Sequence, residues 1–308
     1  LFMIKKQGLT ELSLSPEANS RALNYPLFFG LLAFSLLLRL YLAAKIRGYG
    51  VDIGCFTGWC SNLTQNGTST FYQGEGHSDY PPGYMLVLLL LGNIARLFSL
   101  PINEFLVKIP PILADIAGIA LIFKYAKTKS NEKAALILAF MYAINPLILL
   151  TGAGWGQVDS FTSLSLMMVV ILSLEKKWSL VFPCFILSAL LKPQALMFGP
   201  LGLMAIVLEI IWSDKKHRLS QLKSMLIGLI LSLLVFFAVV IPFNAKGTTG
   251  FGLWVFELYQ KTMNFYDRAT VNNLNIYFLF GLNWQMVKEL APLNLKLTCL
   301  AIVSFSNL

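Results

Sequence analysis

The sequence predicts an all-α protein that crosses a membrane several times. Of its 308 residues, 56% are hydrophobic and only 13% are charged, and the mean hydropathy is +0.68. A soluble domain carries about 25% charged residues. Crossing about 30 Å of hydrocarbon takes roughly 20 helical residues, and apolar stretches of this order recur along the whole chain. They leave no room between them for a soluble domain.

The lengths of the apolar runs and the polar residues between them predict the membrane helices. The expected ranges are 25–46, 104–126, 133–152, 158–174, 178–191, 194–212 and 220–243. The polar segment 1–24 lacks the apolar core of a signal peptide, so we expect a cytoplasmic N-terminal segment followed by one membrane domain over 25–308. The final apolar run is too short to span, and we expect further helices to follow it.

The basic residues decide how the run 82–98 is placed. If this run does not cross, all the basic clusters face the cytoplasm, as the positive-inside rule requires. We therefore expect 82–98 to form a re-entrant or juxtamembrane arm on the outer face. These clusters also explain the net charge of +9, so nucleic-acid binding is not needed to account for it. They are Lys5, Lys6 and Arg21; Lys124, Lys127, Lys129 and Lys133; Lys176 and Lys177; and Lys215, Lys216, Arg218 and Lys223.

This topology brings polar segments together on the outer face. They are the loop 47–81, the short turn at 152–158 and the loop 244–285. Asp52 and Asp79 lie in the first of these segments, and Asp159 lies at the second. An enzyme that works at the outer surface needs such a convergence of carboxylates.

The first outer loop contains two candidate carboxylates. Asp52 lies in "GYGVDIGCFTGWC", whose aromatic residues suit a helix in the membrane interface; in the alternative interpretation, Asp52 only caps that helix. Asp79 and Tyr80 lie in "HSDYPPGY". The two prolines remove amide donors and fix the turn before the next helix, although an ordinary helix start would need the same residues.

Two further segments place polar groups at membrane depth. "WGQVDSF" contains Trp155, Gln157 and Asp159, and a charge at this depth usually faces a cavity or a partner. Asp159 as a helix cap is the alternative. "LKPQAL" contains Lys192 and Gln194. A buried ammonium needs an anion, for which a lipid phosphate is the natural candidate, and snorkelling to the interface is the alternative.

The last outer loop is rich in aromatic and amide side chains. Asn272 and Asn275 suit sugar hydroxyls, and Arg268 suits a phosphate through bidentate pairing; an interfacial aromatic belt explains the aromatic residues equally well. Cys55 and Cys60 share the first outer loop, either as a disulfide or as two free thiols. Two histidines in the whole chain argue against a histidine metal site.

Four motifs together resemble the GT-C superfamily of membrane glycosyltransferases that use polyprenyl-phosphate sugars. They are "VDIGCFTGW", "DYPPGY", "WGQVDSF" and "LKPQAL". The combination is most similar to bacterial mannosyltransferase-like proteins related to the second mannosyltransferase of GPI-anchor synthesis, and "DYPP" is also similar to dolichol-linked glucosyltransferases. The resemblance covers residues from about 25 to 285.

The resemblance implies that Asp52 is the catalytic base of an inverting hexose transfer, with mannose or glucose as the sugar. Many relatives carry two adjacent acidic residues here, whereas Asp52 is followed by Ile53, which leaves Asp79 or Asp159 to supply a second carboxylate. Asp79, Tyr80, Trp155, Gln157, Asp159, Asn272 and Asn275 are expected to bind substrate, and Lys192, Gln194 and Arg268 the phosphate. The chemistry needs no metal cofactor, although Asp52 with Asp159 offers a site for a divalent cation.

The expected partners are a polyprenyl-phosphate sugar, a glycolipid, glycan or protein acceptor, and the lipid bilayer. The expected location is a bacterial plasma membrane, or the endoplasmic reticulum of a eukaryote, with the active site on the extracytoplasmic side. A lipid transporter or flippase is the alternative from another class, because charged groups beside broken helices also build substrate pathways. A transporter should have pseudo-symmetric halves, and the sequence contains no repeated segment. A catalytically inactive scaffold is the third hypothesis.

Overall fold

The computed structural model describes residues 20–73, 78–244, 252–265, 268, 270, 271 and 276–286. Within these residues the chain is helical, and its β contacts are isolated bridges. The predicted all-α membrane fold is therefore confirmed. The α-helices are α1 Ser20–Lys45, α2 Gly50–Asn66, α3 Pro82–Leu97, α4 Glu104–Lys129, α5 Glu132–Ala143, α6 Pro146–Ile148, α7 Asp159–Leu174, α8 Trp178–Leu191, α9 Gly199–Trp212, α10 Lys215–Val240, α11 Trp254–Phe265 and α12 Ile276–Leu279.

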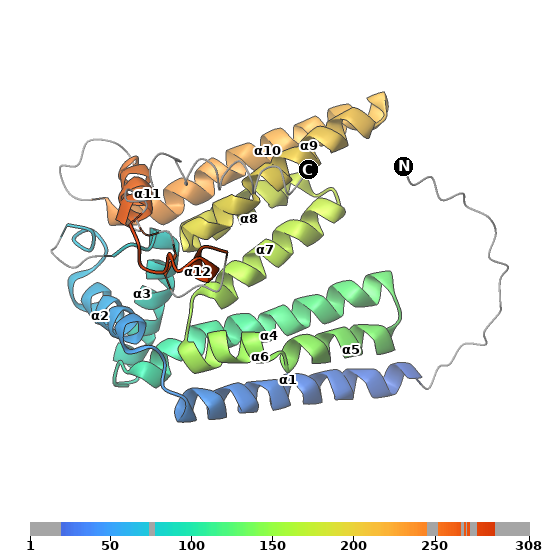
Figure 1. The fold of residues 1–308 in the computed structure, drawn as a ribbon. Coiled ribbons are helices and arrows are strands. Elements are labelled where there is room, and N and C mark those ends of the chain that lie inside the picture. The colour runs from blue at the N-terminus through green and yellow to red at the C-terminus, as the bar shows by residue number, and fades with distance from the viewer. Residues whose placement is uncertain are drawn as a thin grey trace.

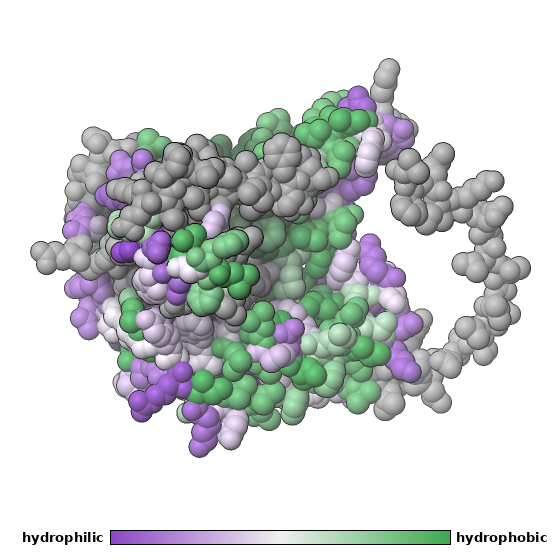
Figure 2. All heavy atoms as spheres, viewed as in Figure 1, coloured by the Kyte–Doolittle hydropathy of each residue, from purple (hydrophilic) through white to green (hydrophobic). Residues whose placement is uncertain are grey.

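The long helices run side by side as a bundle (Figure 1). Helix α4 packs against α1, α5 and α7, and α8 packs between α7 and α10. Figure 2 shows hydrophobic residues along these helices and hydrophilic residues mostly toward the two ends. Many large apolar side chains are exposed on this surface, as expected where lipid replaces water as the solvent.

Among the described residues, four helices are long and apolar enough to cross a membrane: Tyr25–Lys45, Glu104–Lys129, Pro193–Trp212 and His217–Phe243. Each coincides with a predicted range to within about three residues at either end. The predicted ranges 158–174 and 178–191 are helices too, of 16 and 14 residues. They pack against each other, and the Ser188 hydroxyl donates a 2.8 Å hydrogen bond to Ser165 Oγ between them.

The predicted continuous helix over 133–152 is wrong, because the chain breaks and bends by 44° after α5. Pro146 cannot donate an amide hydrogen bond, and the side chain of Asn145 instead accepts from the amides of Leu147 and Ile148. After the short helix α6, the chain forms the π-helix η1, Leu149–Trp155. π-Helical turns are rare and often lie at functional sites.

The basic clusters gather at one end of the bundle. Figure 1 shows the connections α4–α5, α7–α8 and α9–α10 at this end, together with the start of α1. These connections carry Lys127, Lys129, Lys176 and Lys177, among others. The arrangement agrees with the topology in which 82–98 does not cross.

Helices α2 and α3 lie at the opposite end of the bundle (Figure 1). α3 begins at Pro82 with Pro81 as its N-cap, so the two prolines set the point where the helix starts. Half of the 16 residues of α3 are buried, against α2, α4, α8 and α10. This placement fits the expected juxtamembrane arm.

A buried ion pair joins α1 to α4 inside the bundle. Arg39 Nε donates to Asp115 Oδ2 over 3.2 Å, and Arg39 Nη1 donates to the Ala143 carbonyl over 3.0 Å. The backbone of Gly152 in η1 packs directly on the Asp115 carboxylate. A charge at membrane depth needs such a partner, and the pair sets α1, α4, α5 and η1 against one another.

Gly83→Ala should destabilise the fold, because α3 and α8 touch backbone to backbone at this position. A Cβ on Gly83 would lie 2.5 Å from the Leu190 carbonyl oxygen. Overpacking of this kind costs about 1–3 kcal/mol, and the thermal midpoint in detergent should fall. Gly30→Ala is the control, since its Cβ would meet nothing within 4 Å. Equal midpoints for the two variants would contradict the close packing.

Candidate functional site

Asp52 accepts two hydrogen bonds from a distant part of the chain. Its Oδ2 accepts from Trp155 Nε1 over 2.9 Å and from Gln157 Nε2 over 2.5 Å. Helix α2 begins two residues earlier, with Tyr49 as an N-cap that makes no side-chain bond. The interpretation of Asp52 as a cap is therefore wrong, whereas the expected helix after the first span is confirmed.

The two bonds leave one oxygen of this carboxylate open. Both donors reach Oδ2, and among the described residues no hydrogen bond to Oδ1 is found. Asp52 is thus oriented by one oxygen and can accept a proton at the other.

A glycine turn presents both donors. Gly156 has a left-handed backbone with φ of +82°, which a side chain would disfavour. The amides of Gly156 and Gln157 donate to the Thr151 carbonyl over 3.1 and 3.0 Å. They close the last turn of η1 and place Trp155 and Gln157 on either side of Gly156, with Trp155 44% exposed and Gln157 8% exposed.

Lys192 and Asp159 form an ion pair beside this turn. Lys192 Nζ lies 2.6 Å from Asp159 Oδ1, with side-chain exposures of 16% and 44%. Helix α8 ends at Leu191 because Pro193 follows. The N-cap of α7 is Val158, so Asp159 is not a cap. Lys192 was expected to pair with a lipid phosphate, but its anionic partner in the structure is Asp159. This ion pair also explains the buried ammonium better than snorkelling to the interface does.

Tyr80 lies among aromatic rings next to this pair. Its ring centroid is 5.5 Å from that of Trp59 and 6.0 Å from that of Phe56. Lys192 Nζ lies 5.9 Å from the Tyr80 ring centroid. Tyr80 therefore separates the ion pair from the aromatic face of α2.

Carboxylates from the first two outer segments all act on the same phenol. Burial raises the pKa of Tyr80 well above its ordinary value, and the charges of Asp159, Asp79 and Asp52 raise it further. The phenol is therefore a neutral hydrogen-bond donor at physiological pH. The expected convergence of Asp52, Asp79 and Asp159 is present.

The Asp79–Tyr80 loop is held by its backbone. Thr262 Oγ1 of α11 donates to the Asp79 carbonyl over 3.2 Å. The Tyr72 hydroxyl donates to the Tyr80 carbonyl over 2.8 Å. With the prolines that follow, these bonds fix the backbone from which the Asp79 side chain projects.

Of the four other predicted residues, two are described in the structure. Gln194 is exposed in the 3₁₀ segment after α8. Arg268 Nη1 donates to the Trp284 carbonyl over 2.9 Å. Asn272 and Asn275 lie outside the described residues. Within the part of the chain that is described, no group of three or more His, Cys, Asp or Glu residues could hold a metal ion, and Cys55 and Cys60 are free thiols.

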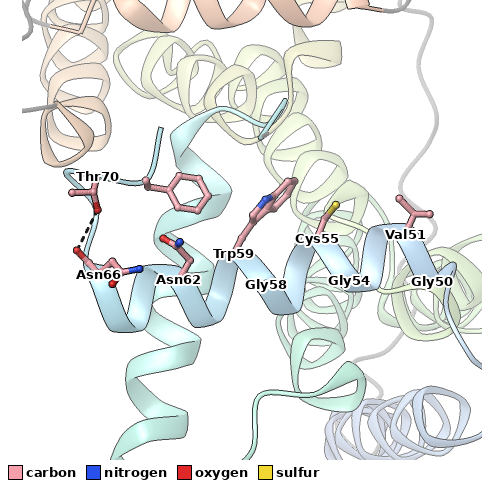
Figure 3. Close-up of a pocket in the computed structure, with 10 residues that line it drawn as sticks. Gly50, Val51, Gly54, Cys55, Gly58, Trp59, Asn62, Asn66 and Thr70 are labelled. Atoms are coloured by element: carbon pink, nitrogen blue, oxygen red, sulfur yellow. Dashed lines mark hydrogen bonds between the residues drawn. The ribbon is translucent and has the colours of Figure 1, made fainter. Parts of the chain in front are cut away.

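A groove that sequence reasoning missed runs along α2 (Figure 3). Its volume is about 850 Å³. Trp59 lines the groove and also packs on Tyr80, so the groove adjoins the carboxylate group. The signal in the sequence was a glycine at every fourth position of "GVDIGCFTG", which leaves one helix face without side chains. The lining also includes Gly50, Gly54, Gly58, Asn62 and Asn66.

The sequence profile of one protein family, described as GPI transamidase subunit PIG-U, matches residues 62–284. The chain belongs to the PIG-U family. None of the curated proteins compared with it matches. The PIG-U family is distantly related to GT-C-type membrane proteins, so the resemblance found in the sequence holds at this coarser level. The match includes Asp79, Gln157, Asp159 and Lys192 but begins after Asp52.

The thiol of Cys55 reports on the charge of Asp52. Burial raises the pKa of Cys55, and the nearby charges of Asp52 and Asp79 raise it further. Because the thiolate is the reactive form, Asp52→Asn should lower the pKa of Cys55 and speed its alkylation at pH 8. The shift is measured as the pH dependence of labelling by mass spectrometry. Cys60, which is fully buried, is the internal control, and an unchanged Cys55 profile would contradict an ionised Asp52 beside the thiol.

Proposed function

We propose that this PIG-U family protein transfers a hexose, mannose or glucose, from a polyprenyl-phosphate donor to a hydroxyl acceptor at the outer membrane face. The observation that supports it most is the Asp52 carboxylate, held by two donors at one oxygen and open at the other. It lies in the same group as the Lys192–Asp159 ion pair. A base and a cation at one membrane edge are what this transfer needs.

Asp52 is the proposed general base. The acceptor oxygen attacks the anomeric carbon as the bond from that carbon to the phosphate oxygen breaks, which inverts the configuration. The acceptor's proton passes to Asp52 Oδ1. General-base catalysis of this kind contributes about 10²- to 10⁴-fold in rate.

Lys192 is the proposed partner of the departing polyprenyl phosphate. The leaving group carries negative charge, and a cation already in place stabilises it without reorganisation. Asp159 Oδ1 lies 2.6 Å from Lys192 Nζ and holds this ammonium 5.9 Å from the centroid of the Tyr80 ring. Arg268 and Gln194 are the secondary candidates for the phosphate, and Asp79, Tyr80, Trp155, Gln157, Asn272 and Asn275 for the sugars.

The groove along α2 is the proposed approach for the acceptor. Its glycines leave the helix backbone open, Trp59 offers an aromatic face and Asn62 offers an amide. Pockets for polar ligands combine apolar walls with a few polar groups in this way. Gly50 and Val51 line the groove, and Asp52 follows them in the same helix turn. An acceptor bound in the groove can therefore bring its hydroxyl near the proposed base.

A second candidate is binding without transfer. The family is described as a GPI transamidase subunit, and in this alternative the chain binds a glycolipid as one subunit of a membrane complex. Lys192 already has a counter-ion in Asp159, and the family match begins after Asp52; both observations favour this candidate. A lipid flippase, which would bind and move a lipid without transferring a sugar, belongs to the same candidate.

Asp52→Asn should reduce release of polyprenyl phosphate by about 10²- to 10⁴-fold. The measurement uses the protein in lipid vesicles with radiolabelled polyprenyl-phosphate mannose and, in parallel, the glucose donor. Asp214→Asn is the matched control, because Asp214 is exposed at the α9–α10 connection, and it should turn over normally.

Wild-type turnover in Asp52→Asn would contradict the assignment of the base. If the wild-type protein binds the donor but releases no polyprenyl phosphate from either sugar, the binding candidate replaces the transferase. An unchanged rate in the presence of a chelator is expected, since a donor with one phosphate requires no metal.

A further inference from the structure

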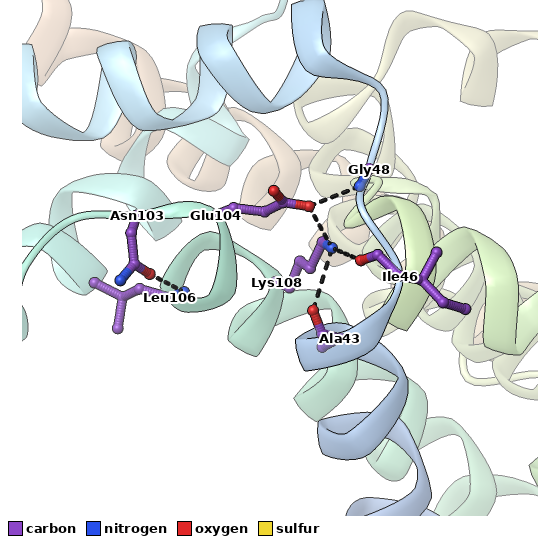
Figure 4. A network of polar contacts seen from close by, with 7 residues as sticks. All are labelled: Ala43, Ile46, Gly48, Asn103, Glu104, Leu106 and Lys108. Carbon is purple, nitrogen blue, oxygen red and sulfur yellow. Dashed lines mark hydrogen bonds and ion pairs between the residues drawn. The ribbon is translucent and has the colours of Figure 1, made fainter.

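Lys108 is a fully buried lysine of α4 whose ammonium holds the end of α1 (Figure 4). Nζ donates to the carbonyls of Ile46 over 2.8 Å and Ala43 over 3.4 Å. Carbonyl groups at a helix C-terminus lack partners within the helix, and a cation there also interacts well with the helix dipole. One side chain therefore fixes the end of α1 to α4.

Glu104, one turn earlier in α4, completes this contact. Its Oε1 lies 2.7 Å from Lys108 Nζ and accepts from the Gly48 amide over 2.6 Å. Figure 4 shows both side chains directed at the connection between α1 and α2. Asp52 lies in the first turn of α2, directly after this connection.

The turn that carries Trp155 and Gln157 packs against Lys108 and against the α1–α2 connection. A Cβ on Gly156 would lie 2.8 Å from Lys108 Cγ, so the backbone of the glycine turn lies on the lysine stem. A Cβ on Gly48 would lie 2.7 Å from the Trp155 carbonyl oxygen. The α1–α2 connection, α4 and the turn 155–157 thus meet with no space for another carbon atom.

We propose that Glu104 and Lys108 are positioning residues for the site. They hold the segment that leads to Asp52 against the turn that carries Trp155 and Gln157, so that both donors reach one carboxylate oxygen. Neither touches the substrate. The catalytic consequence rests on the proposed function, whereas the geometric one does not.

Stability alone does not account for this ion pair, in which Lys108 is fully buried and Glu104 is 34% exposed. Burial costs the ammonium its hydration, so such a pair is often no more stabilising than apolar residues of similar volume. What the pair adds is three hydrogen bonds that join α4 to the end of α1 and to the α1–α2 connection, and one bond within α4. Its replacement should therefore change the geometry of the site more than the stability of the fold.

The first test measures whether Asp52 and Gln157 remain coupled when the lysine is replaced. In the wild-type background, Asp52→Leu and Gln157→Leu each remove the hydrogen bond between these two side chains, so their losses in thermal midpoint should be less than additive. In a Lys108→Met background, which keeps an unbranched stem under Gly156, the two losses should become additive. This readout needs no enzymatic activity.

The second test measures turnover. In Lys108→Met, kcat for polyprenyl phosphate release should fall by about 10²-fold, the loss expected from a misplacement of about 1 Å. KM for the donor should stay within about twofold, because the Lys192–Asp159 pair is untouched. If the substitution only lowered the folded fraction, the amount of active enzyme would fall instead. Measuring the amount of donor bound at saturation detects this loss.

Lys127→Met is the matched control. It removes an ion pair with Glu132 at the other end of the same helix, and the coupling and kcat should both stay at wild-type values. Glu104→Leu is the second variant, because it removes the bonds to the Gly48 amide and to Lys108 without altering the turn that carries Trp155 and Gln157. It should abolish the coupling as Lys108→Met does, and it decides the question if Lys108→Met does not fold.

Wild-type coupling in folded Lys108→Met or Glu104→Leu protein would overturn the proposal, as would fully additive losses in the wild-type background. Loss of coupling in both variants, with Lys127→Met unaffected, would support it. A wild-type protein without turnover would defeat the proposed function but leave the coupling test decisive.

Discussion

The hydrogen bonds that Asp52 accepts are the interaction on which the site depends. They join α2 to a turn more than a hundred residues later in the chain. The same turn leads directly into α7, whose first residue, Asp159, pairs with Lys192 after α8. The Asp52 carboxylate and the Lys192–Asp159 ion pair are therefore linked through one short segment, and a displacement of that segment would separate them.

Local backbone chemistry and buried charge place this segment. Pro146 breaks the helix after α5, and Gly156 permits the left-handed turn that ends η1. Inside the bundle, Asp115 packs under Gly152 and pairs with Arg39. Polar groups at membrane depth are costly unless paired, so each pair selects one packing of the helices around it.

The sequence was sufficient for the fold class and for most of the charged residues of the site, because apolar run lengths and the cost of charge in a membrane are local properties. It could not supply the partner of Lys192, since that depends on how α7 packs on α8. Nor did it indicate Lys108, because Glu104 and Lys108 resemble an ordinary exposed pair spaced four residues apart at a helix start. The break at Asn145–Pro146 was available as a signal; the π-helix was not, because no residue type specifies it.

The central claim is that Asp52 and Lys192 serve one ligand at this end of the bundle. A cryo-electron microscopy structure of the protein in lipid nanodiscs with bound polyprenyl phosphate tests it most directly. The account predicts phosphate density against Lys192 Nζ, with the Asp52 carboxylate still bonded to Trp155 and Gln157 and facing the same space. A phosphate bound away from Lys192, or an Asp52 carboxylate separated from both donors, would contradict it.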